Sequence, residues 1–406
     1  MRAHAPPTAA TLRWLFAIQL LAMGAMEMSG PFWPLHLRSL GDLSSQSLAW
    51  ASAVAYAGPM AMAMLFTPLW GRLGDRTGHK PMVLRALLAL AATQLWVAVA
   101  ETTVTVLAAR LVQGALAGFI AAAQAYGAGI VPKDKRGRLM ARLQVATALG
   151  SVLGPLAGGM LFDGMGFRTL NLVAAAICIF CAVATLFALP AVRAQTASNA
   201  STDTQAEPFL RSAVTGLLLA IVLVQSGKMM PQSFFGLFAE QVLHAPAWLT
   251  GLCYGATALG ICVAAPFWGK RFSDKPKAAI LKRIEWICWT SAAVVALQAV
   301  SRDVATILLM RLLWGICLAA LLPVFYGLLS READEQSQGR VLGLGNSAAK
   351  AGALLGAAAG GLTLAWLPVQ HAFWPVAALY AVSALGVRAL KEKDEAVEIA
   401  ERNAPV

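Results

Sequence analysis

The sequence predicts an all-α membrane protein with twelve transmembrane helices in two pseudo-symmetric six-helix bundles. Three observations predict this fold class: the apolar composition, a series of apolar runs of membrane-spanning length, and motifs that recur in the second half of the chain. Of the 406 residues, 58% are hydrophobic and 13% are charged, and the mean hydropathy is +0.65. Soluble domains carry roughly 25% charged residues. The apolar side chains are therefore too many for a soluble core.

Twelve apolar runs reach the length of about 20 residues that a helix needs to cross the hydrocarbon core of a membrane. None of them alternates polar and apolar residues with a period of two, the pattern typical of a membrane β-barrel. The predicted spans cover residues 14–37, 47–70, 82–100, 103–130, 139–162, 168–190, 212–238, 247–268, 279–300, 303–329, 341–365 and 370–389.

Four short motifs recur at an offset of 198 to 202 residues, which indicates that the two halves arose by duplication. Four matches in one register are hard to obtain by chance, so we expect two bundles of the same design. The matched segments are 68–71 with 266–269, 110–114 with 311–315, 137–138 with 339–340, and Gly154, Gly158 and Gly159 with Gly356, Gly360 and Gly361.

One long polar stretch, residues 191–210, separates the two sets of six spans. It is rich in Ala, Ser, Thr, Asp and Gln, a composition typical of a flexible linker. The sequence therefore predicts four parts: an N-terminal six-helix bundle over 1–190, a cytoplasmic linker over 191–210, a C-terminal six-helix bundle over 211–390, and a cytoplasmic tail over 391–406.

The basic residues lie mostly on one side of the predicted spans. With the N-terminus inside, only Arg38, Arg168 and Arg302 of the 32 Lys and Arg residues fall on outside loops. This bias predicts that both termini are cytoplasmic, in a bacterial-type inner membrane. The bias also explains the net charge of +12. We therefore interpret the dense basic cluster at 270–283 as a cytoplasmic loop that contacts anionic lipid, and we expect no nucleic-acid partner.

No catalytic or cofactor-binding constellation emerges from the sequence. The six cysteines all fall inside predicted spans, where they are expected to act as small packing residues, and none has metal-ligand spacing with a histidine. There is no phosphate-binding loop and no Ser-His-Asp set that the spans would bring together. We expect a monomeric protein that is not an enzyme and has neither a cofactor nor a metal.

A basic, glycine-rich segment at 71–80 separates the second and third spans. Its sequence, GRLGDRTGHK, follows the pattern G-x-L-x-D-R-x-G-x-K. The pattern and its position resemble the loop signature of the major facilitator superfamily, whose transporters have two six-helix halves and bind substrate near the membrane midplane. The resemblance implies that this loop closes the cytoplasmic side when the cavity faces outward. The gating residues it implies are Gly71, Asp75, Arg76, Gly78 and Lys80.

Five charged residues lie deep in predicted spans, where each costs about 2.5–3.5 kcal/mol at the membrane centre. They are Glu27, Arg110, Lys228, Arg311 and Lys350. The resemblance assigns all five to spans that surround the central cavity. The repeat matches Glu27 with Lys228 and Arg110 with Arg311. Because a buried carboxyl can load and release a proton, Glu27 is the candidate proton-coupling residue; the alternative is a static ion pair with Arg110 or Lys228.

Two further motifs resemble those of proton-driven members of the family. Arg110 begins R-x-x-Q-G in the fourth span, where the resemblance links the arginine to proton transfer; a snorkelling or carbonyl-capping arginine is the alternative. The fifth span contains G-x-x-x-G-P-x-x-G-G, which resembles the antiporter motif of exporters. Closely spaced glycines let helices approach and proline bends the helix, so we expect a flat, kinked hinge between the two halves here. The hinge residues are Gly150, Gly154, Pro155, Gly158 and Gly159.

Four cations and one acid share the predicted cavity spans, a charge balance that favours an anionic or zwitterionic substrate. One neutral lysine would weaken this inference, because burial disfavours its charged form. Polar residues at repeat-matched positions add candidate contacts. The predicted substrate-binding residues are Lys228, Arg311, Lys350, Asn346, Gln144, Tyr56, Tyr254 and Gln113.

These observations predict a secondary active transporter that exchanges protons for a small exported anion or zwitterion. The first span resembles that of exporters from carboxylate-type siderophore pathways. Its partners would be a small-molecule substrate, protons and the lipid bilayer. Three alternatives stay open: a multidrug efflux antiporter, an anion or metabolite importer that works by proton symport, and a non-transporting membrane sensor.

Overall fold

The protein is helical throughout the part of the chain that the structure describes. The computed structural model describes residues 9–41, 43–116, 118–190, 212–272, 275–332 and 338–402, and every regular element in these ranges is an α-helix or a short 3-10 helix. The predicted linker at 191–210 lies outside them. In a helix the backbone N–H and C=O groups pair with each other within the segment. The hydrocarbon core of a membrane requires this pairing because it contains no water.

The described residues form two compact units. Unit 1 contains those within 1–44, 54–204 and 246–255, and unit 2 contains those within 45–53, 205–245 and 256–406. Two helices are shared, because α3 (Ser45–Thr77) begins in unit 2 and α10 (Ala247–Phe272) begins in unit 1.

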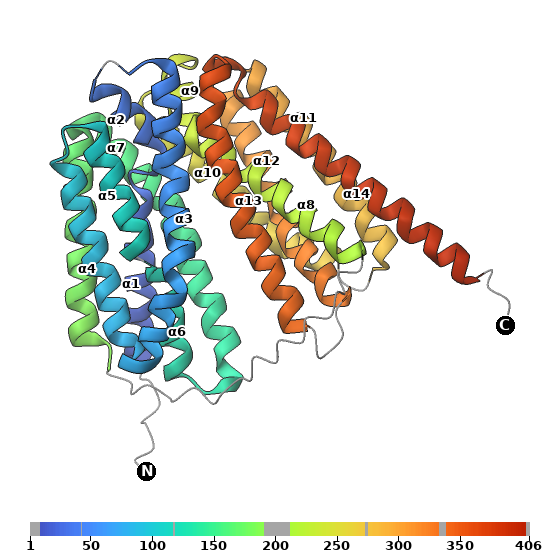
Figure 1. The fold of residues 1–406 in the computed structure, drawn as a ribbon, viewed down its shortest axis with the longest axis horizontal. Helices are drawn as coiled ribbons and strands as arrows, with labels where there is room; N and C mark the ends of the chain where they lie inside the picture. Colours follow the sequence, from blue (N-terminus) through green and yellow to red (C-terminus); the bar gives the residue numbers. More distant parts are fainter. Residues whose placement is uncertain are drawn as a thin grey trace, which may run out of the picture. The chain divides into compact units, whose positions relative to one another are not determined.

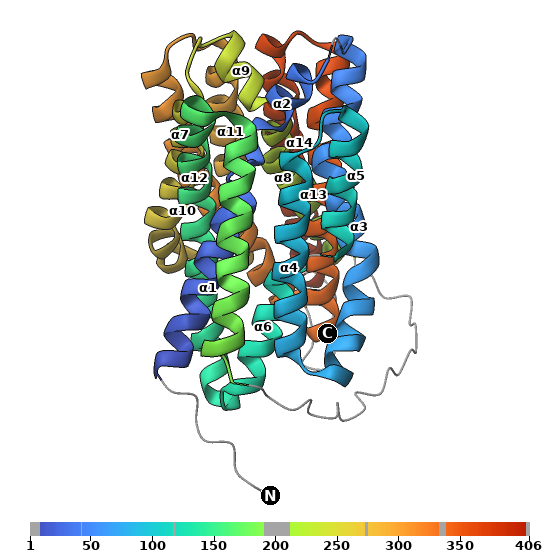
Figure 2. The same cartoon turned by 90° about the vertical axis from the view of Figure 1, so that its left-hand side faces the viewer.

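Unit 1 is built around α7, against which α1 and α4 pack (Figure 2). Besides its parts of α3 and α10, unit 1 contains α1 (Ala9–Glu27), η1 (Gly30–Phe32), α2 (Trp33–Ser39), α4 (His79–Ala98), α5 (Thr103–Leu116), α6 (Phe119–Ile130) and α7 (Lys133–Ala188). The first predicted span is thus a broken helix: α1 ends at Glu27, and Pro31, which has no N–H to donate, opens the 3-10 turn that leads into α2.

The helix α7 contains two predicted spans, 139–162 and 168–190. Its 56 residues run without interruption of the helical pattern except at Gly166, whose φ of 78° and ψ of 173° reverse the chain direction. Only glycine adopts this backbone conformation at low cost. The described run Arg138–Ala188 is apolar and far longer than one membrane crossing requires, so it accounts for two spans.

Unit 2 has the same plan, with α8 packed against α13 and α14, and α11 packed along α14 (Figure 1). Its elements are α8 (Ser212–Met229), η2 (Met230–Ser233), α9 (Phe235–Gln241), α11 (Lys277–Val300), α12 (Val304–Glu332), α13 (Gln338–Trp366), η3 (Val369–His371) and α14 (Phe373–Arg402). The predicted tail from residue 391 therefore continues α14 as far as Arg402.

Ten helical segments among the described residues are long and apolar enough to cross a membrane. The predicted ninth span forms α11 but is not among the ten, because Arg283, Glu285 and Gln298 lower its mean hydropathy. With α11 included and with the long run of α7 broken at Gly166, the helices correspond to the twelve predicted spans.

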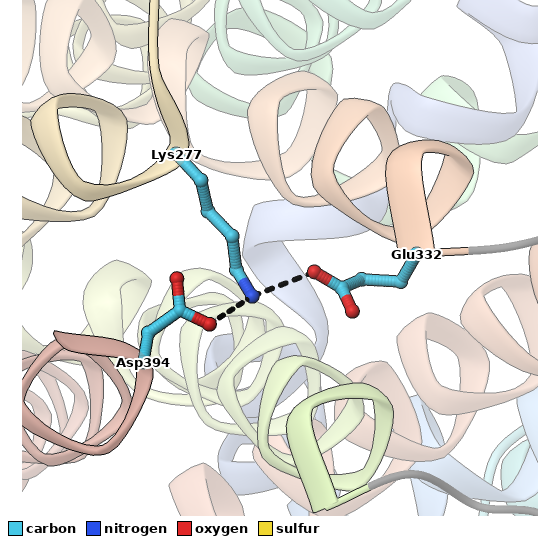
Figure 3. A network of polar contacts seen from close by, with 3 residues as sticks. All are labelled: Lys277, Glu332 and Asp394. Atoms are coloured by element: carbon cyan, nitrogen blue, oxygen red, sulfur yellow. Dashed lines mark hydrogen bonds and ion pairs between the residues drawn. The ribbon is translucent and has the colours of Figure 1, made fainter. Parts of the chain in front are cut away.

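A charged triad joins three helices of unit 2. Lys277 Nζ at the start of α11 lies 2.6 Å from Glu332 Oε1 of α12 and 2.5 Å from Asp394 Oδ1 of α14, as Figure 3 shows. Burial alone would lower the pKa of Lys277, but the hydrogen bonds to the two carboxylates outweigh it and raise that pKa. The lysine therefore stays charged and joins three segments that are far apart in sequence.

Candidate functional site

Glu27 lies where the first span breaks, at the last residue of α1, and its side chain is half-buried. Two glycines make room for it. A methyl group in place of the Gly30 hydrogen would lie 3.3 Å from Glu27 Oε2, and one on Gly154 of α7 would lie 3.1 Å from Glu27 Cβ. The Glu27 side chain thus lies between the helix break, which its carboxyl approaches, and the glycine-rich face of α7, which its Cβ atom approaches.

Arg110 of α5 is fixed by three contacts in unit 1. Its Nε donates to the carbonyl oxygen of Ala55 at 3.0 Å, and its Nη1 donates to Gln113 Oε1 one turn away. The guanidinium carbon also lies 4.5 Å from the centre of the Trp33 ring, a cation–π contact. These contacts hold Arg110 away from a snorkelling position, and its bond to the Ala55 carbonyl is the contact that the carbonyl-capping alternative predicts.

Tyr56 connects this arginine to the helix break. Its hydroxyl donates to the carbonyl oxygen of Gly30 at 2.5 Å. It lies within electrostatic range of Glu27, Arg110 and Tyr254, and Arg110 lies within range of Glu27. Five of the predicted site residues therefore meet in unit 1. We call them the unit 1 cluster: Glu27, Tyr56, Arg110, Gln113 and Tyr254.

The unit 1 cluster combines one carboxyl with a fixed cation and several hydrogen-bonding groups. A carboxyl can bind and release a proton, phenols and an amide can donate and accept hydrogen bonds, and a guanidinium keeps its charge throughout the physiological pH range. The carboxyl is therefore the group whose charge can change. Because it shares a site with a fixed cation, its protonation alters the electrostatic balance between α1 and α5.

Arg311 of α12 and Arg110 occupy matched positions in the repeat, but their surroundings differ. The Arg311 side chain is 1% exposed, and its guanidinium carbon lies 3.6 Å from the ring centre of Phe235, 5.4 Å from that of Trp314 and 5.6 Å from that of Phe373. Arg311 was predicted to contact substrate, and in this structure its guanidinium is enclosed by aromatic rings.

The other predicted substrate residues lie on helix faces rather than in that aromatic cluster. Lys228 is half-buried in the last turn of α8, at the break that matches the one after Glu27. On α13, Asn346 accepts a hydrogen bond of 2.9 Å from Tyr326, and Lys350 follows one turn later on the same exposed face. Gln144 is exposed on α7 in unit 1.

The predicted gating loop is mostly helix. Residues 71–77 are the last turns of α3, and the chain turns at Gly78 alone, whose φ of 93° and ψ of 155° require glycine. Gly71 and Arg76 are exposed on the end of α3, and the side chain of Asp75 lies outside the described part of the structure. Lys80 donates to the carbonyls of Leu186 and Leu189, at 2.8 and 2.5 Å. These bonds cap the C-terminal end of α7, which sequence reasoning did not indicate.

The glycines of the fifth-span motif bring α7 into backbone contact with α1. Methyl groups on Gly150, Gly154 and Gly158, each one turn apart, would overlap the backbone of α1 and the break that follows it. Larger side chains in such a close approach force the helices apart. The expected close helix contact is therefore present, and it joins two helices of the same unit.

Unit 2 repeats this contact with the same spacing. Gly352, Gly356 and Gly360 of α13 pack against Val222, Ser226 and Met230 along α8 and η2. Each of these residues lies 202 positions after its counterpart in the contact between α7 and α1. The duplication seen in the sequence is thus also a duplication of backbone packing.

The remaining motif residues face the start of α10. The Pro155 carbonyl lies against Gly251, and Gly159 lies against Ala247, all within unit 1. One turn further along α7, Asp163 accepts hydrogen bonds from the backbone N–H groups of Ala247 and Trp248, at 2.9 and 2.8 Å. Sequence reasoning missed Asp163; the signal was an acid one turn beyond a glycine motif.

The architecture is that of a multi-pass helical membrane protein built from two similar bundles, with ionisable residues at matched helix breaks. This is the architecture of a secondary transporter. The chain belongs to the Major Facilitator Superfamily, whose model matches residues 15–288 and 280–405. Members of this family are transporters and not enzymes.

Individual relatives are distant but match over most of the chain. It is 27% identical to the staphyloferrin B transporter of Staphylococcus aureus over 382 residues, which cover 92% of this chain and 91% of the relative. It is 27% identical to the multidrug resistance protein MdtG of Yersinia enterocolitica over 397 residues, 93% and 94% of the two chains. A bacterial homologue of the human lysosomal transporter Spinster, solved in an inward-facing and occupied conformation, has the same fold: the TM-score is 0.73 at 12% identity, covering 96% of each chain.

Proposed function

We propose that this protein is a proton-coupled exporter of a small anionic or zwitterionic molecule. The observation that carries the proposal is the unit 1 cluster, in which the carboxyl of Glu27 lies within electrostatic range of Arg110 and Tyr56 at a break in the first span. An ionisable residue within a membrane span is costly and is a functional candidate by default.

In the proposed cycle, Glu27 takes up a proton from the outside and releases it to the cytoplasm. Protonation removes the negative charge beside Arg110 and favours return to the inward-facing form. Substrate from the cytoplasm then competes for the charged cavity, and its export is coupled to the inward movement of the proton. Arg110, held by Ala55 and Gln113, keeps the fixed positive charge against which the proton is exchanged.

Basic residues of unit 2 support an anionic or zwitterionic substrate. Lys228, Arg311 and Lys350 supply three cations, and guanidinium groups suit carboxylates because they form two parallel hydrogen bonds. The relative named as a staphyloferrin B transporter supports the narrower proposal of a carboxylate-type siderophore. In this cycle Arg311 contacts substrate only in a conformation in which the rings around it have moved.

A multidrug efflux antiporter is the second candidate. The relative named as the multidrug resistance protein MdtG favours it, and Glu27 supplies one acid that could attract a cationic drug. The three basic residues of unit 2 favour the anion instead. The two candidates differ in the charge of the substrate and share the proton-coupling role of Glu27.

The fifth-span motif supports export over import, since it resembles that of antiporters. In this proposal Gly150, Gly154, Pro155, Gly158 and Gly159 form a hinge, and the end of α3 with Gly71, Asp75, Arg76, Gly78 and Lys80 closes the cytoplasmic side. The protein would be a monomer in a bacterial inner membrane with both termini in the cytoplasm and no nucleic-acid partner. Two functional bundles, 1–190 and 211–390, would be joined by the linker at 191–210.

Vesicles of opposite orientation test the proposal. In everted membrane vesicles with an acidic lumen, addition of citrate as an anionic probe should release protons, measured as recovery of acridine orange fluorescence. The cationic probe ethidium should give the smaller signal, and the reverse order would favour the multidrug candidate. Accumulation of citrate only in right-side-out vesicles with an acidic exterior would identify a proton symporter, and no proton movement with any probe would favour a sensor.

A further inference from the structure

An apolar groove lies between α10, α11 and α12, entirely within unit 2. Its cavity volume is about 390 Å³, and one face of α10 and one face of α12 form its walls, with Ile280 of α11 between them. The groove exists because small residues line both walls: Ala265 and Gly269 in α10, and Ala319 and Gly327 in α12. Carbon atoms added at Gly269 or Gly327 would meet nothing within 4 Å.

The length of this groove matches one leaflet of a membrane. Arg331 lies 12 positions after Ala319 along α12, a distance of roughly 18 Å at the helical rise of about 1.5 Å per residue. Half of the hydrocarbon core of a bilayer is about 15 Å thick. A single acyl chain therefore fits the groove in both its polarity and its depth.

The end of the groove is basic. Arg331, in the last turn of α12, lines the groove, is exposed, and donates from Nη1 to the carbonyl oxygen of Lys275 at 2.8 Å. A guanidinium has five N–H donors, so this bond orients Arg331 and leaves it able to bind phosphate oxygens. Lys270 and Arg271, both exposed, end the facing wall in α10.

The acid next to Arg331 on α12 is already paired with a lysine, so it repels an anion at the groove only weakly. Glu332, next to Arg331, is paired with Lys277 in the triad of Figure 3. Among the residues that the structure describes, the side chains at the groove end are thus mainly basic, and basic pockets between membrane helices at the cytoplasmic side suit the head groups of anionic lipids.

The corresponding place in unit 1 is filled. Tyr126 of α6 lies 201 positions before Gly327, is buried, and donates from its hydroxyl to the carbonyl oxygen of Pro190 at 2.9 Å. At the matched position in unit 2 there is no side chain, and a groove takes its place. The repeat-matched position thus carries a buried phenol in unit 1 and no side chain in unit 2.

We propose that this groove binds one anionic phospholipid, with an acyl chain along Gly269 and Gly327 and the phosphate on Arg331. The proposal is independent of what the protein transports. Its test is lipid binding to the purified full-length protein, measured by native mass spectrometry with phosphatidylglycerol and, separately, phosphatidylcholine.

The wild-type protein should retain phosphatidylglycerol in preference to phosphatidylcholine. Arg331→Gln should weaken phosphatidylglycerol binding about fivefold, the effect of one basic residue near an anionic surface, and leave phosphatidylcholine unchanged. Gly327→Tyr, which copies Tyr126, should reduce binding of both lipids. Arg388→Gln is the matched control, because Arg388 is an exposed arginine of unit 2 that pairs with Glu392 away from the groove.

Three results would overturn the proposal. Equal binding of the two lipids to wild type would remove the head-group claim, and unchanged phosphatidylglycerol binding in Arg331→Gln would remove the phosphate contact. A change of oligomeric state in Gly327→Tyr without a change in bound lipid would mean that a second copy of the chain fills the groove. Since Arg331 is exposed, its variant reports on binding even where Gly327→Tyr fails to fold.

Discussion

The carboxylate of Asp163 accepts a hydrogen bond from the backbone N–H of Ala247, with 2.9 Å between Oδ1 and the nitrogen. Its second oxygen accepts the N–H of Trp248 at 2.8 Å. The first N–H groups of a helix have no partner within the helix, and a carboxylate there also interacts favourably with the helix dipole. The start of α10 is thus held by α7 within unit 1, while the rest of α10 belongs to unit 2.

Replacement of Asp163 by Ala should weaken this attachment. Loss of a helix-capping side chain costs about 0.5–2 kcal/mol, so the thermal unfolding midpoint in detergent should fall by a few degrees. In Asp163→Asn one acceptor oxygen remains, and we expect a smaller decrease. Labelling of an Ala247→Cys variant by a membrane-impermeant maleimide should be faster when Asp163 is Ala. Equal labelling in the presence and absence of the carboxylate would show that the cap does not hold α10.

Backbone contact between α7 and α1 predicts a strong effect of a single methyl group. In Gly158→Ala the new carbon would overlap the carbonyl of Met28, and overpacking of this kind costs about 1–3 kcal/mol. Gly164→Ala in the same helix is the control, because a carbon there meets nothing within 4 Å. Thermal unfolding of the two variants in detergent should differ clearly. Equal stability would mean that α1 and α7 can separate without cost.

The triad of Figure 3 predicts a measurable contribution from Lys277. In Lys277→Met, Glu332 and Asp394 lose their shared cation, and for partly exposed pairs of this kind we expect a loss of about 1 kcal/mol. Lys282→Met on the exposed face of α11 is the control. Thermal unfolding measures both, and no difference between the variants would assign the triad no role in stability.

The pH dependence of the same variant follows from the raised pKa of Lys277. A lysine whose pKa is higher in the folded state contributes stability that is fully present below the pKa of the unfolded chain and is lost as the pH rises through the folded value. The difference between wild type and Lys277→Met should therefore be constant between about pH 7 and 9 and shrink only in stronger base.

Replacement of Lys228 by Ala tests the charge of the substrate. If Lys228 binds an anion, the apparent affinity for citrate should fall about tenfold or more, because a hydrogen bond to a charged group contributes about 1.5–3 kcal/mol. A neutral probe of similar size should be affected far less. Lys135→Ala, an exposed lysine of α7, is the control. Equal losses for the anionic and the neutral probe would remove the argument for an anionic substrate.

Much of the fold could be predicted because apolar composition identifies membrane spans. The duplication also matches spans of the first half with spans of the second half. The same duplication pointed to Glu27, Arg110 and Tyr56, and these side chains lie within electrostatic range of one another in unit 1. Side-chain surroundings were harder to predict. The enclosure of Arg311 by Phe235, Trp314 and Phe373 depends on the tertiary arrangement of α9, α12 and α14, which apolar periodicity does not reveal.

The ends of the helices were also difficult to predict from the sequence. The pattern at 71–80 reads as a loop because glycine and charged residues are common in loops, yet α3 continues to Thr77 and a single glycine makes the turn. Asp163 and Lys277 belong to no recognisable sequence motif, because each bonds to residues more than 50 positions away in the sequence. Contacts of that kind require the packed structure.

The most direct test of proton coupling is citrate-induced proton release from everted vesicles that contain Glu27→Gln. The glutamine keeps the shape of the side chain between Gly30 and α7 but cannot carry a proton, and Glu285→Gln on α11 is the matched control. The account predicts that proton release is abolished by Glu27→Gln, retained by Glu285→Gln and partly retained by Glu27→Asp. Proton release of wild-type size in Glu27→Gln would contradict it.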